Sequence, residues 1–377
     1  MAARRTPIGT ASHAFKALTV DRLAAPVIEA VARDVAHLGV PVEDVVLGNC
    51  TGPGGNIARV SALAAGMGHG VPGVTVDRQC GSGLAAILLA GQAIRGGDMD
   101  LVIAGGAESA STAPMRAHRG PADGQSVPYD RAPFVPAGHP DPDMGPAAEA
   151  LASARGVTRE RQDAYACQSH VKALAAREAG RFGQEIVEVG GRRDDQWPRV
   201  LRMRSLARLP AAFVPGGTVT AGNSSPVSDG AAAVAVVPER LRAAAGLPGL
   251  RLRAGAVVGC DPGLPGLGPV LAVRRVLERE GVDLERVTAV EIVEAFAAQV
   301  LAVTDALGLD PLGPDSGRVC ADGGALALGH PWGATGAVVV TRLFGRLVRA
   351  GAPPGTLGLA TAAVGGGLGV AALFEVV

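Results

Sequence analysis

The chain has 377 residues, more than one hydrophobic core usually organises, so we expect two packed units. Its 35 basic residues balance its 35 acidic ones, which excludes the general electrostatic attraction that a nucleic-acid or anionic-membrane binder needs. Hydrophobic residues make up 48% and aromatic ones only 3%, and there are 54 glycines. The interior is therefore expected to consist of small aliphatic side chains in close backbone contact, which favours an α/β fold.

The N-terminal segment has two arginines and a proline where a secretory signal needs a continuous apolar run. No stretch of about 20 apolar residues lacks charges or helix breakers, so we expect no membrane span and a cytoplasmic protein. The cysteines are odd in number and include no Cys-x-x-Cys pair, which argues against a disulfide or zinc framework. Free thiols and no metal site are expected.

Apolar runs rich in valine and isoleucine predict buried strands that alternate with helical stretches. These runs are Val42 to Leu47, Val74 to Val76, Leu101 to Ala104, Ala232 to Val237 and Leu357 to Thr361. The alternation predicts parallel sheets covered by helices. Segment 81–106 resembles segment 333–361 in composition, since each is a glycine-opened helical stretch before an apolar run, and this echo indicates two related halves.

The middle of the chain has a different character. Many prolines lie within residues 112–146, among them Pro121, and they exclude long helices and central strands, so we predict an excursion over the surface. A helix is predicted from Thr158 to Ala179. The arginines that follow predict a solvated loop face or, alternatively, a seat for phosphate groups, because arginine side chains bind phosphate oxygens as forks. They are Arg192, Arg193, Arg199, Arg202, Arg204 and Arg208.

Cys80 is the candidate nucleophile because it lies between a predicted strand and the first turn of a predicted helix. Unpaired N–H groups and the helix dipole are expected to stabilise its thiolate, and Gly81 and Gly83 to allow a tight exposing bend. A buried cysteine that only packs at the helix start is an equal alternative. A dinucleotide-binding turn also matches the glycine spacing, but the next strand runs into glycines instead of the expected ribose-binding acid.

His330 lies between glycines just before another predicted helix, where it is suited to accept a proton from a thiol. A core histidine held by backbone groups explains the same pattern. Near the C terminus, glycines from Gly365 to Gly369 follow a predicted strand and leave successive N–H groups unobstructed. Such a turn can hold an oxyanion, or it can be a plain tight turn.

Together these segments resemble the thiolase family along nearly the whole chain. The matching motifs, in the family's order, are Arg5-Thr-Pro-Ile-Gly, Cys80-Gly-Ser-Gly, Ala104-Gly-Gly-Ala-Glu-Ser, Gly217-Thr-Val-Thr-Ala-Gly-Asn-Ser-Ser, Asp229-Gly-Ala-Ala-Ala, Gly268-Pro-Val, Glu294-Ala-Phe-Ala and Gly323-Gly-Ala-Leu-Ala-Leu-Gly-His-Pro. The resemblance implies two related α/β/α halves, residues 1–248 and 249–377, stacked into a five-layer subunit, with a loop domain inserted at about 112–211. It also implies a homodimer or homotetramer that acts on acyl-CoA thioesters, with coenzyme A entering only as part of the substrate and no separate cofactor.

The resemblance implies roles for individual residues. Cys80 takes the acyl group, His330 activates it, and the N–H groups of Cys80 and Gly365 form an oxyanion hole. The substrate-binding positions implied in the same way are Ser225, Met144 and Phe296.

This chain departs from the family pattern at the remaining catalytic positions. Val293 stands where the family usually has an asparagine that fixes a water in a second oxyanion hole, and Ala363 stands where it has a second cysteine that moves the α-proton of acetyl-CoA. Asp143 stands where biosynthetic members commonly have a histidine. By their nearness to the motifs, Cys320 and Glu294 are candidates for a substitute acid or base, as is Asp322.

The leading hypothesis is therefore a thiolase-like acyltransferase that works through an acyl-cysteine, in 3-ketoacyl-CoA thiolysis or Claisen-type condensation. A decarboxylative condensing enzyme, or simple acyl transfer or hydrolysis, is the first alternative, because decarboxylation makes a carbanion without removing a proton. A catalytically silent homologue that acts as a binding partner is the second alternative.

Overall fold

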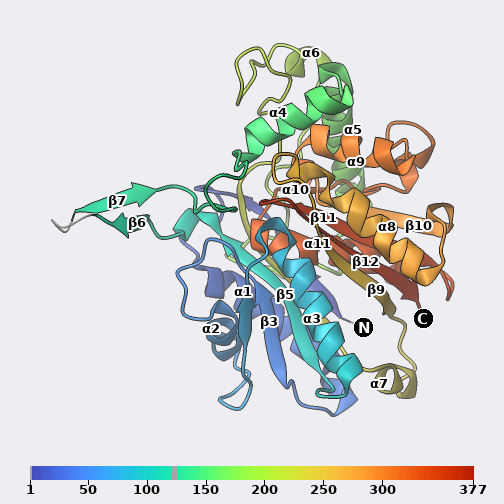
Figure 1. Ribbon diagram of the computed structural model, residues 1–377. Coiled ribbons are helices and arrows are strands. Elements are labelled where there is room, and N and C mark those ends of the chain that lie inside the picture. Colours follow the sequence, from blue (N-terminus) through green and yellow to red (C-terminus); the bar gives the residue numbers. More distant parts are fainter. Residues whose placement is uncertain (1, 121–124) are drawn as a thin grey trace.

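The computed structural model describes residues 2–120 and 125–377 and has two β-sheets that alternate with layers of helices (Figure 1). Helices pack on the outer face of each sheet, and a further helical layer lies between the sheets. The order of layers is α/β/α/β/α, which confirms the predicted fold.

The sheet of the N-terminal half has the strand order β1-β8-β5-β3-β4, and β2 pairs with β8. Its strands are β1 (Ala3–Arg5), β2 (Gly9–Thr10), β3 (Asp44–Gly48), β4 (Val74–Val76), β5 (Val102–Ser109) and β8 (Ser228–Val236). Every residue of β5 is buried, as expected of a central strand covered by helices on both faces.

The sheet of the C-terminal half has the strand order β10-β11-β12-β9. Its strands are β9 (Leu250–Gly259), β10 (Val287–Ile292), β11 (Leu357–Val364) and β12 (Leu368–Val376). β11 and β12 form a hairpin whose turn is the run of glycines 365–367, with Val364 opposite Leu368. Gly366 and Gly367 have φ angles of 82° and 77°, which glycine adopts without strain.

The prediction of parallel sheets is wrong in part, because both sheets are mixed. β3 lies parallel to β4 and β5, and β10 lies parallel to β11. By contrast, β8 runs antiparallel to β5, and β12 runs antiparallel to β11 and β9. A run of buried small residues predicts a strand covered on both faces, but it does not encode the direction in which the chain enters that strand.

The helices divide among three layers. The outer layer of the N-terminal half has α1 (Val20–Val35) and α2 (Ile57–Ala64), the central layer has α3 (Ser82–Gly96) and α11 (Trp332–Leu343), and the outer layer of the C-terminal half has α8 (Gly268–Glu280) and α9 (Ala297–Leu307). α3 and α11 approach closely: a Cβ on Gly83 would lie 2.8 Å from the backbone nitrogen of Ala337. This close approach confirms the expectation of a core built on glycine and small side chains.

Between β5 and β8 the chain makes the predicted excursion. A hairpin of β6 (Arg116–Arg119) and β7 (Ser126–Tyr129) projects from the body (Figure 1). The elements that follow are α4 (Met144–Arg155), α5 (Arg159–Glu178) and α6 (Met203–Leu206), while α7 (Glu239–Ala244) joins β8 to β9, and α10 (Ala325–Leu328) precedes α11. α5 confirms the predicted helix from Thr158 to Ala179. Pro121 lies outside the described residues.

A buried ionic network fastens the end of the excursion to the core. The guanidinium of Arg5 in β1 donates to Glu185 at 2.7 Å and to Asp195 at 2.7 Å and 2.9 Å. Arg342 in α11 donates to Glu185 as well, and also to Asp322. All five side chains are buried, so removal of one partner would leave an uncompensated charge in the interior.

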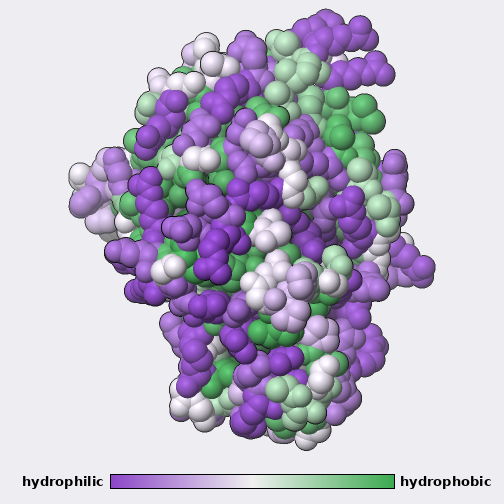
Figure 2. All heavy atoms as spheres, turned by 90° about the vertical axis from the view of Figure 1, so that its right-hand side faces the viewer, coloured by the Kyte–Doolittle hydropathy of each residue, from purple (hydrophilic) through white to green (hydrophobic). Residues whose placement is uncertain are grey.

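One face of the molecule is largely polar. Figure 2, which faces the side of α8 and the C terminus, shows mostly hydrophilic side chains with small groups of hydrophobic ones between them. No helix in the described part of the chain has an apolar stretch long enough to cross a membrane.

Candidate active site

The structure places Cys80 where the sequence predicted, in a turn between β4 and α3. The turn is a 3₁₀ segment, Gln79–Gly81, and α3 begins at Ser82. The Ser82 hydroxyl accepts from the Arg78 N–H at 2.7 Å and donates to the Gln79 carbonyl at 2.7 Å, which closes the turn. The bend itself lies at Gln79, whose φ of 45° is in the left-handed region that side chains rarely adopt.

The predicted role of Gly81 and Gly83 is wrong, because they serve packing and not the bend. A Cβ on Gly81 would lie 2.8 Å from a methyl group of Val364 and 3.0 Å from one of Val370, and Gly83 lies against α11. No space for a pyrophosphate remains beside these glycines, which disfavours the dinucleotide alternative.

The electrostatics of Cys80 also differ from the expectation. Burial raises the pKa of its thiol to about 12, and the backbone N–H of Cys80, which lowers the pKa, offsets this only in part. The nearby carboxylates of Glu108 and Asp77 raise the pKa further. The free site therefore holds a neutral thiol, not a preformed thiolate.

Cys80 lines a cavity of about 40 Å³ that elements from both halves enclose. Its walls come from the turn before α3, from α4, from a short 3₁₀ turn (Pro265–Leu267), from Phe296 and the start of α9, and from the end of β11. Ala363 and Gly365 line the same cavity. Among the described residues that line it, Cys80 alone is titratable.

His330 is fixed in one tautomer by its neighbours. The Thr335 hydroxyl donates to the Pro331 carbonyl at 2.9 Å, and it lies 2.8 Å from Nδ1 of His330. Because that hydroxyl has a single hydrogen, it must accept from Nδ1–H, which leaves Nε2 with a free lone pair. His330 is 3% exposed, and burial lowers its pKa to about 4, so the ring is neutral.

Cys80 and His330 are not hydrogen-bonded to each other in the structure. Nε2 of His330 is buried and has no hydrogen-bond partner in the described part of the chain, and His330 does not line the cavity. Its backbone lies two residues before α11, the helix that packs against the turn of Cys80. A proton-accepting nitrogen thus lies just before the helix that packs against the turn of the nucleophile, and catalytic hydrogen bonds often tighten only when substrate binds.

The glycine turn after β11 is covered by a residue that the sequence did not indicate. Gly365 is buried, and the ring of Phe134 packs against it. The guanidinium of Arg131 lies 4.4 Å from the centre of that ring and pairs with Asp141 and Asp143. Phe134 belongs to the proline-rich excursion, whose fold over the site no local pattern reveals.

The implied substrate-binding residues form two groups. Met144 and Phe296 line the cavity, and Phe296 stacks edge-on with Phe213, with ring centres 5.9 Å apart. Ser225 does not line the cavity, but its backbone N–H and its hydroxyl both donate to the carbonyl of Ala295, next to Phe296. Ser225 is therefore bound to the backbone next to Phe296, one of the residues that line the cavity.

Neither substitute acid or base enters the cavity. Glu294 is buried and accepts from the Tyr165 hydroxyl at 2.7 Å, the Ser169 hydroxyl at 2.7 Å and the Leu326 N–H at 3.2 Å. Burial raises the pKa of the Cys320 thiol well above its usual range, and its sulfur contacts the backbone of Ile292. Both residues are held by structural contacts, and Asp322 is likewise engaged by Arg342.

The arginines that follow α5 do not gather into a single cluster. Arg193 pairs with Glu188, and Arg199 lies 3.6 Å from the centre of the Trp197 ring. The exposed ones on and beside α6 are Arg202, Arg204 and Arg208. α6 packs close to the segment before Ser225, because a Cβ on Gly222 would lie 2.5 Å from Leu206.

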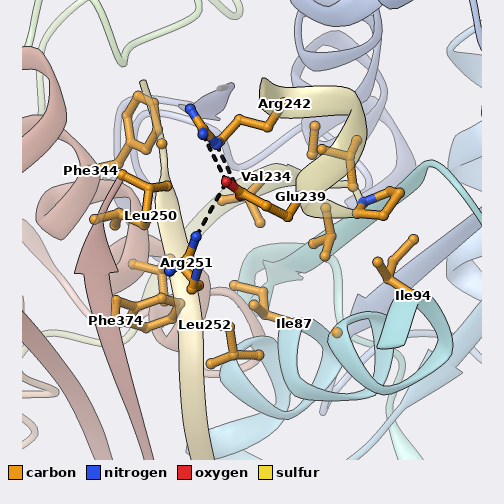
Figure 3. Close-up of a pocket in the computed structure, with 18 of the residues that line it drawn as sticks. Ile87, Ile94, Val234, Glu239, Arg242, Leu250, Arg251, Leu252, Phe344 and Phe374 are labelled. Atoms are coloured by element: carbon orange, nitrogen blue, oxygen red, sulfur yellow. Dashed lines mark hydrogen bonds and ion pairs between the residues drawn. The ribbon is translucent and has the colours of Figure 1, made fainter. Parts of the chain in front are cut away.

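A larger cavity lies away from this chemistry. It has a volume of about 430 Å³ and is lined mostly by apolar side chains of α3, β8, β9 and β12 (Figure 3). Glu239, paired with Arg242 and Arg251, closes one side of it. Neither Cys80 nor His330 lines this cavity.

Comparisons with known proteins agree with this architecture. A family model for the thiolase N-terminal domain matches residues 1–240, and one for the thiolase C-terminal domain matches residues 248–376. The acetyl-CoA acetyltransferase of Pseudomonas aeruginosa is 41% identical in an alignment of 391 positions that covers 98% of this chain and 97% of that protein. An acetyl-CoA acetyltransferase of Escherichia coli is 40% identical in an alignment of 395 positions that covers 100% of this chain and 98% of that protein. The crystal structure of the Bacillus anthracis acetyl-CoA acetyltransferase superposes with a TM-score of 0.90 at 38% identity, covering 100% of this chain and 98% of that one.

Proposed function

The chain belongs to the thiolase family of acyltransferases, and we propose that it transfers short acyl groups from acyl-CoA thioesters through an acyl intermediate on Cys80. The observation that carries this proposal is that Cys80 shares one small cavity with Gly365 and Ala363. The names of the relatives, acetyl-CoA acetyltransferases, agree with acetyl as the group transferred.

In the first half-reaction, Sγ of Cys80 attacks the thioester carbonyl carbon while its proton passes to Nε2 of His330. The new carbon–sulfur bond forms as the carbonyl oxygen gains negative charge, which the N–H groups of Cys80 and Gly365 stabilise. Collapse of this intermediate breaks the bond to the CoA sulfur, and the CoA thiolate takes the proton back from His330. The raised pKa of Cys80 and the lowered pKa of His330 mean that this transfer accompanies attack and does not precede it.

We infer from the family resemblance that this chain departs from its family at the carbon–carbon step. Ala363 lines the cavity at the position of the usual second cysteine, and its methyl group cannot exchange a proton. Val293, at the position of the usual asparagine, is buried in the apolar core and offers no amide. Loss of a general base commonly costs about 10² to 10⁴ in rate, so we propose that thiolysis and acetyl-CoA condensation are slow in this protein.

A decarboxylative condensation is the second candidate, and the absence of a further titratable group among the described lining residues favours it. Loss of CO₂ from a malonyl thioester leaves the electron pair on the α-carbon, so no base is needed. Faster product formation from malonyl-CoA than from acetyl-CoA as extender supports this candidate, and equal or lower rates exclude it.

Intact-mass spectrometry tests the acyl-cysteine proposal. Incubation with acetyl-CoA should add one acetyl group to the wild type and none to Cys80→Ala. Cys167→Ala, at a half-buried cysteine in α5 that does not line the cavity, is the matched control and should still be acetylated. An unmodified wild type refutes the proposal and leaves the silent-homologue alternative.

We also propose a division into residues 1–248 and 249–377, supported by the separate sheets of the two halves. A homodimer or homotetramer is proposed because β4 is an edge strand whose Val74 is 43% exposed, beside the exposed Val60 and Leu63 of α2. Light scattering coupled to size exclusion measures the assembly directly. The free thiols support a reducing compartment such as the cytoplasm.

A further inference from the structure

Gln299 is a buried amide without a partner at the wall of the Cys80 cavity. Its side chain projects from the first turn of α9 and is 3% exposed. Both Oε1 and Nε2 lack a hydrogen-bond partner in the described part of the chain. Buried amides are nearly always paired, so an orphaned one beside the nucleophile indicates a group that arrives with the ligand.

The side chains that line the cavity near Gln299 offer its amide no hydrogen-bond partner. The nearby lining side chains, Met144, Ala148, Leu151 and Pro265, carry no hydrogen-bonding oxygen or nitrogen. The stem of Gln299 is fixed, because a Cβ on Gly266 would lie 3.2 Å from its Cγ. The amide is therefore held at the wall of an otherwise apolar space.

The cavity volume limits what can reach this amide. About 40 Å³ is room for roughly three water-sized groups. An acyl group on Cys80 thus fits if it has up to about three heavy atoms beyond its carbonyl carbon. An unsubstituted chain of that length would bury the amide of Gln299 against carbon and leave it unpaired.

We propose that Gln299 determines the acyl specificity of this enzyme, by hydrogen bonding to a hydroxyl or carbonyl oxygen on a short acyl chain carried by Cys80. This proposal rests on the acyl-cysteine function proposed above. The substrate class is a short acyl-CoA with an oxygen beyond the thioester carbonyl. A site that hydrogen-bonds a substrate oxygen discriminates strongly against the analogue that lacks it, because the protein group is then left unpaired.

A pair of substrates with the same number of heavy atoms tests the proposal. In 3-hydroxypropionyl-CoA a hydroxyl replaces the terminal methyl of butyryl-CoA, so chain length is constant. The rate of adduct formation on Cys80, followed by intact mass, should be about 10- to 100-fold higher for the hydroxy compound in the wild type. In Gln299→Leu, which keeps size and removes the amide, the ratio should fall to one or below.

Two further variants make the result specific. Gln168→Leu removes another glutamine with an orphaned oxygen, one that does not line the cavity, and it should keep the wild-type ratio. Gln299→Asn takes the place of Gln299→Leu if the latter does not fold. It retains the amide one methylene further back and should give an intermediate ratio. A wild-type ratio near one overturns the proposal, since the amide would then serve only to hold water. Absence of any adduct from either compound instead refutes the acyl-cysteine function itself.

Discussion

A Cβ atom on Gly365 would lie 2.6 Å from Cε2 of Phe134, closer than real contacts allow. Arg131 also contacts this ring, since its guanidinium lies 4.4 Å from the ring centre. The proline-rich excursion therefore packs against the turn that carries the proposed oxyanion N–H. The backbone position of Gly365 depends on this contact between the two halves.

We expect Gly365→Ala to displace either the ring or the turn and to lower the acylation rate about 10² to 10³-fold, the usual effect of losing an oxyanion donor. Single-turnover acetylation of Cys80 measures this rate. Phe134→Ala combined with Gly365→Ala should recover much of it, because the clash is then removed. A double variant as slow as the single one would show that the turn, and not the ring, gives way.

Alkylation of Cys80 should be slow at neutral pH. Burial raises the pKa of this thiol to about 12, and only the thiolate reacts. The labelling rate of the Cys80 peptide with iodoacetamide should rise about tenfold for each pH unit from 7 to 9. A plateau below pH 8 contradicts the raised pKa.

Slow labelling at neutral pH does not distinguish an active enzyme from a silent homologue. With a neutral thiol in the free site, slow labelling is expected of both, and only the acetyl adduct decides between them.

The parts of the site that the sequence predicted lie where short sequence patterns mark the end of a strand or the start of a helix. Cys80 follows a valine-rich segment and precedes a glycine-rich one. The structure has the predicted strand and helix there, as β4 and α3. The glycine turn at 365–367 likewise joins β11 and β12 as a tight turn. Such features depend on neighbours in sequence.

What sequence reasoning missed depends on residues distant along the chain. Gln299 is one of three polar residues in α9, and only the packing of α4 against α9 shows that its amide lacks a partner among the described residues. Phe134 sits in a proline-rich segment without periodicity. The pKa of Cys80 is set by desolvation, which the burying elements supply and the helix start alone does not reveal.

Two buried histidines should make the protein less stable in mild acid. Burial lowers the pKa of His330 and of His170 from 6.5 to about 4. Between those pH values the unfolded chain binds protons that the folded one does not, so the free energy of unfolding falls as pH decreases from 6.5 to 4. The loss is on the order of 3 kcal/mol for each histidine.

Urea unfolding at intervals from pH 7.5 to 4.5 measures this dependence. His170→Asn keeps an acceptor for the Arg199 N–H, which lies 3.2 Å from Nδ1 of His170, and removes one titrating group. Its stability should vary about half as much over that range. An unchanged slope would mean that His170 titrates normally in the folded protein.

Arg204 of α6 and its exposed neighbours Arg202 and Arg208 are expected to contact phosphates of coenzyme A. Arg204→Ala should raise the KM for acetyl-CoA about 5- to 10-fold, the effect of one lost charge-assisted hydrogen bond, and leave kcat unchanged. With the dephospho form of acetyl-CoA, which lacks the 3′-phosphate, the difference in KM between the variant and the wild type should be smaller. Arg193→Ala, whose side chain pairs with Glu188, is the control. An equal rise in that variant would indicate a general charge effect.

Thr335 should act as a positioning residue for His330 without touching substrate. Its hydroxyl lies 2.8 Å from Nδ1, and its removal frees the ring to place the proton on Nε2, where that nitrogen can no longer accept one. Thr335→Val should therefore lower the acetylation rate of Cys80 about 10- to 100-fold while the KM stays constant.

Thr341→Val is the matched control, because Thr341 is also buried in α11 and its hydroxyl donates only to the Ala337 carbonyl. Since both variants lose one buried hydroxyl of the same helix, they should lose similar stability in urea, and a purely structural role for Thr335 predicts equal rates as well. Serine at position 335 restores the hydroxyl without the methyl group, so recovery in Thr335→Ser and not in Thr335→Val assigns the effect to the hydrogen bond.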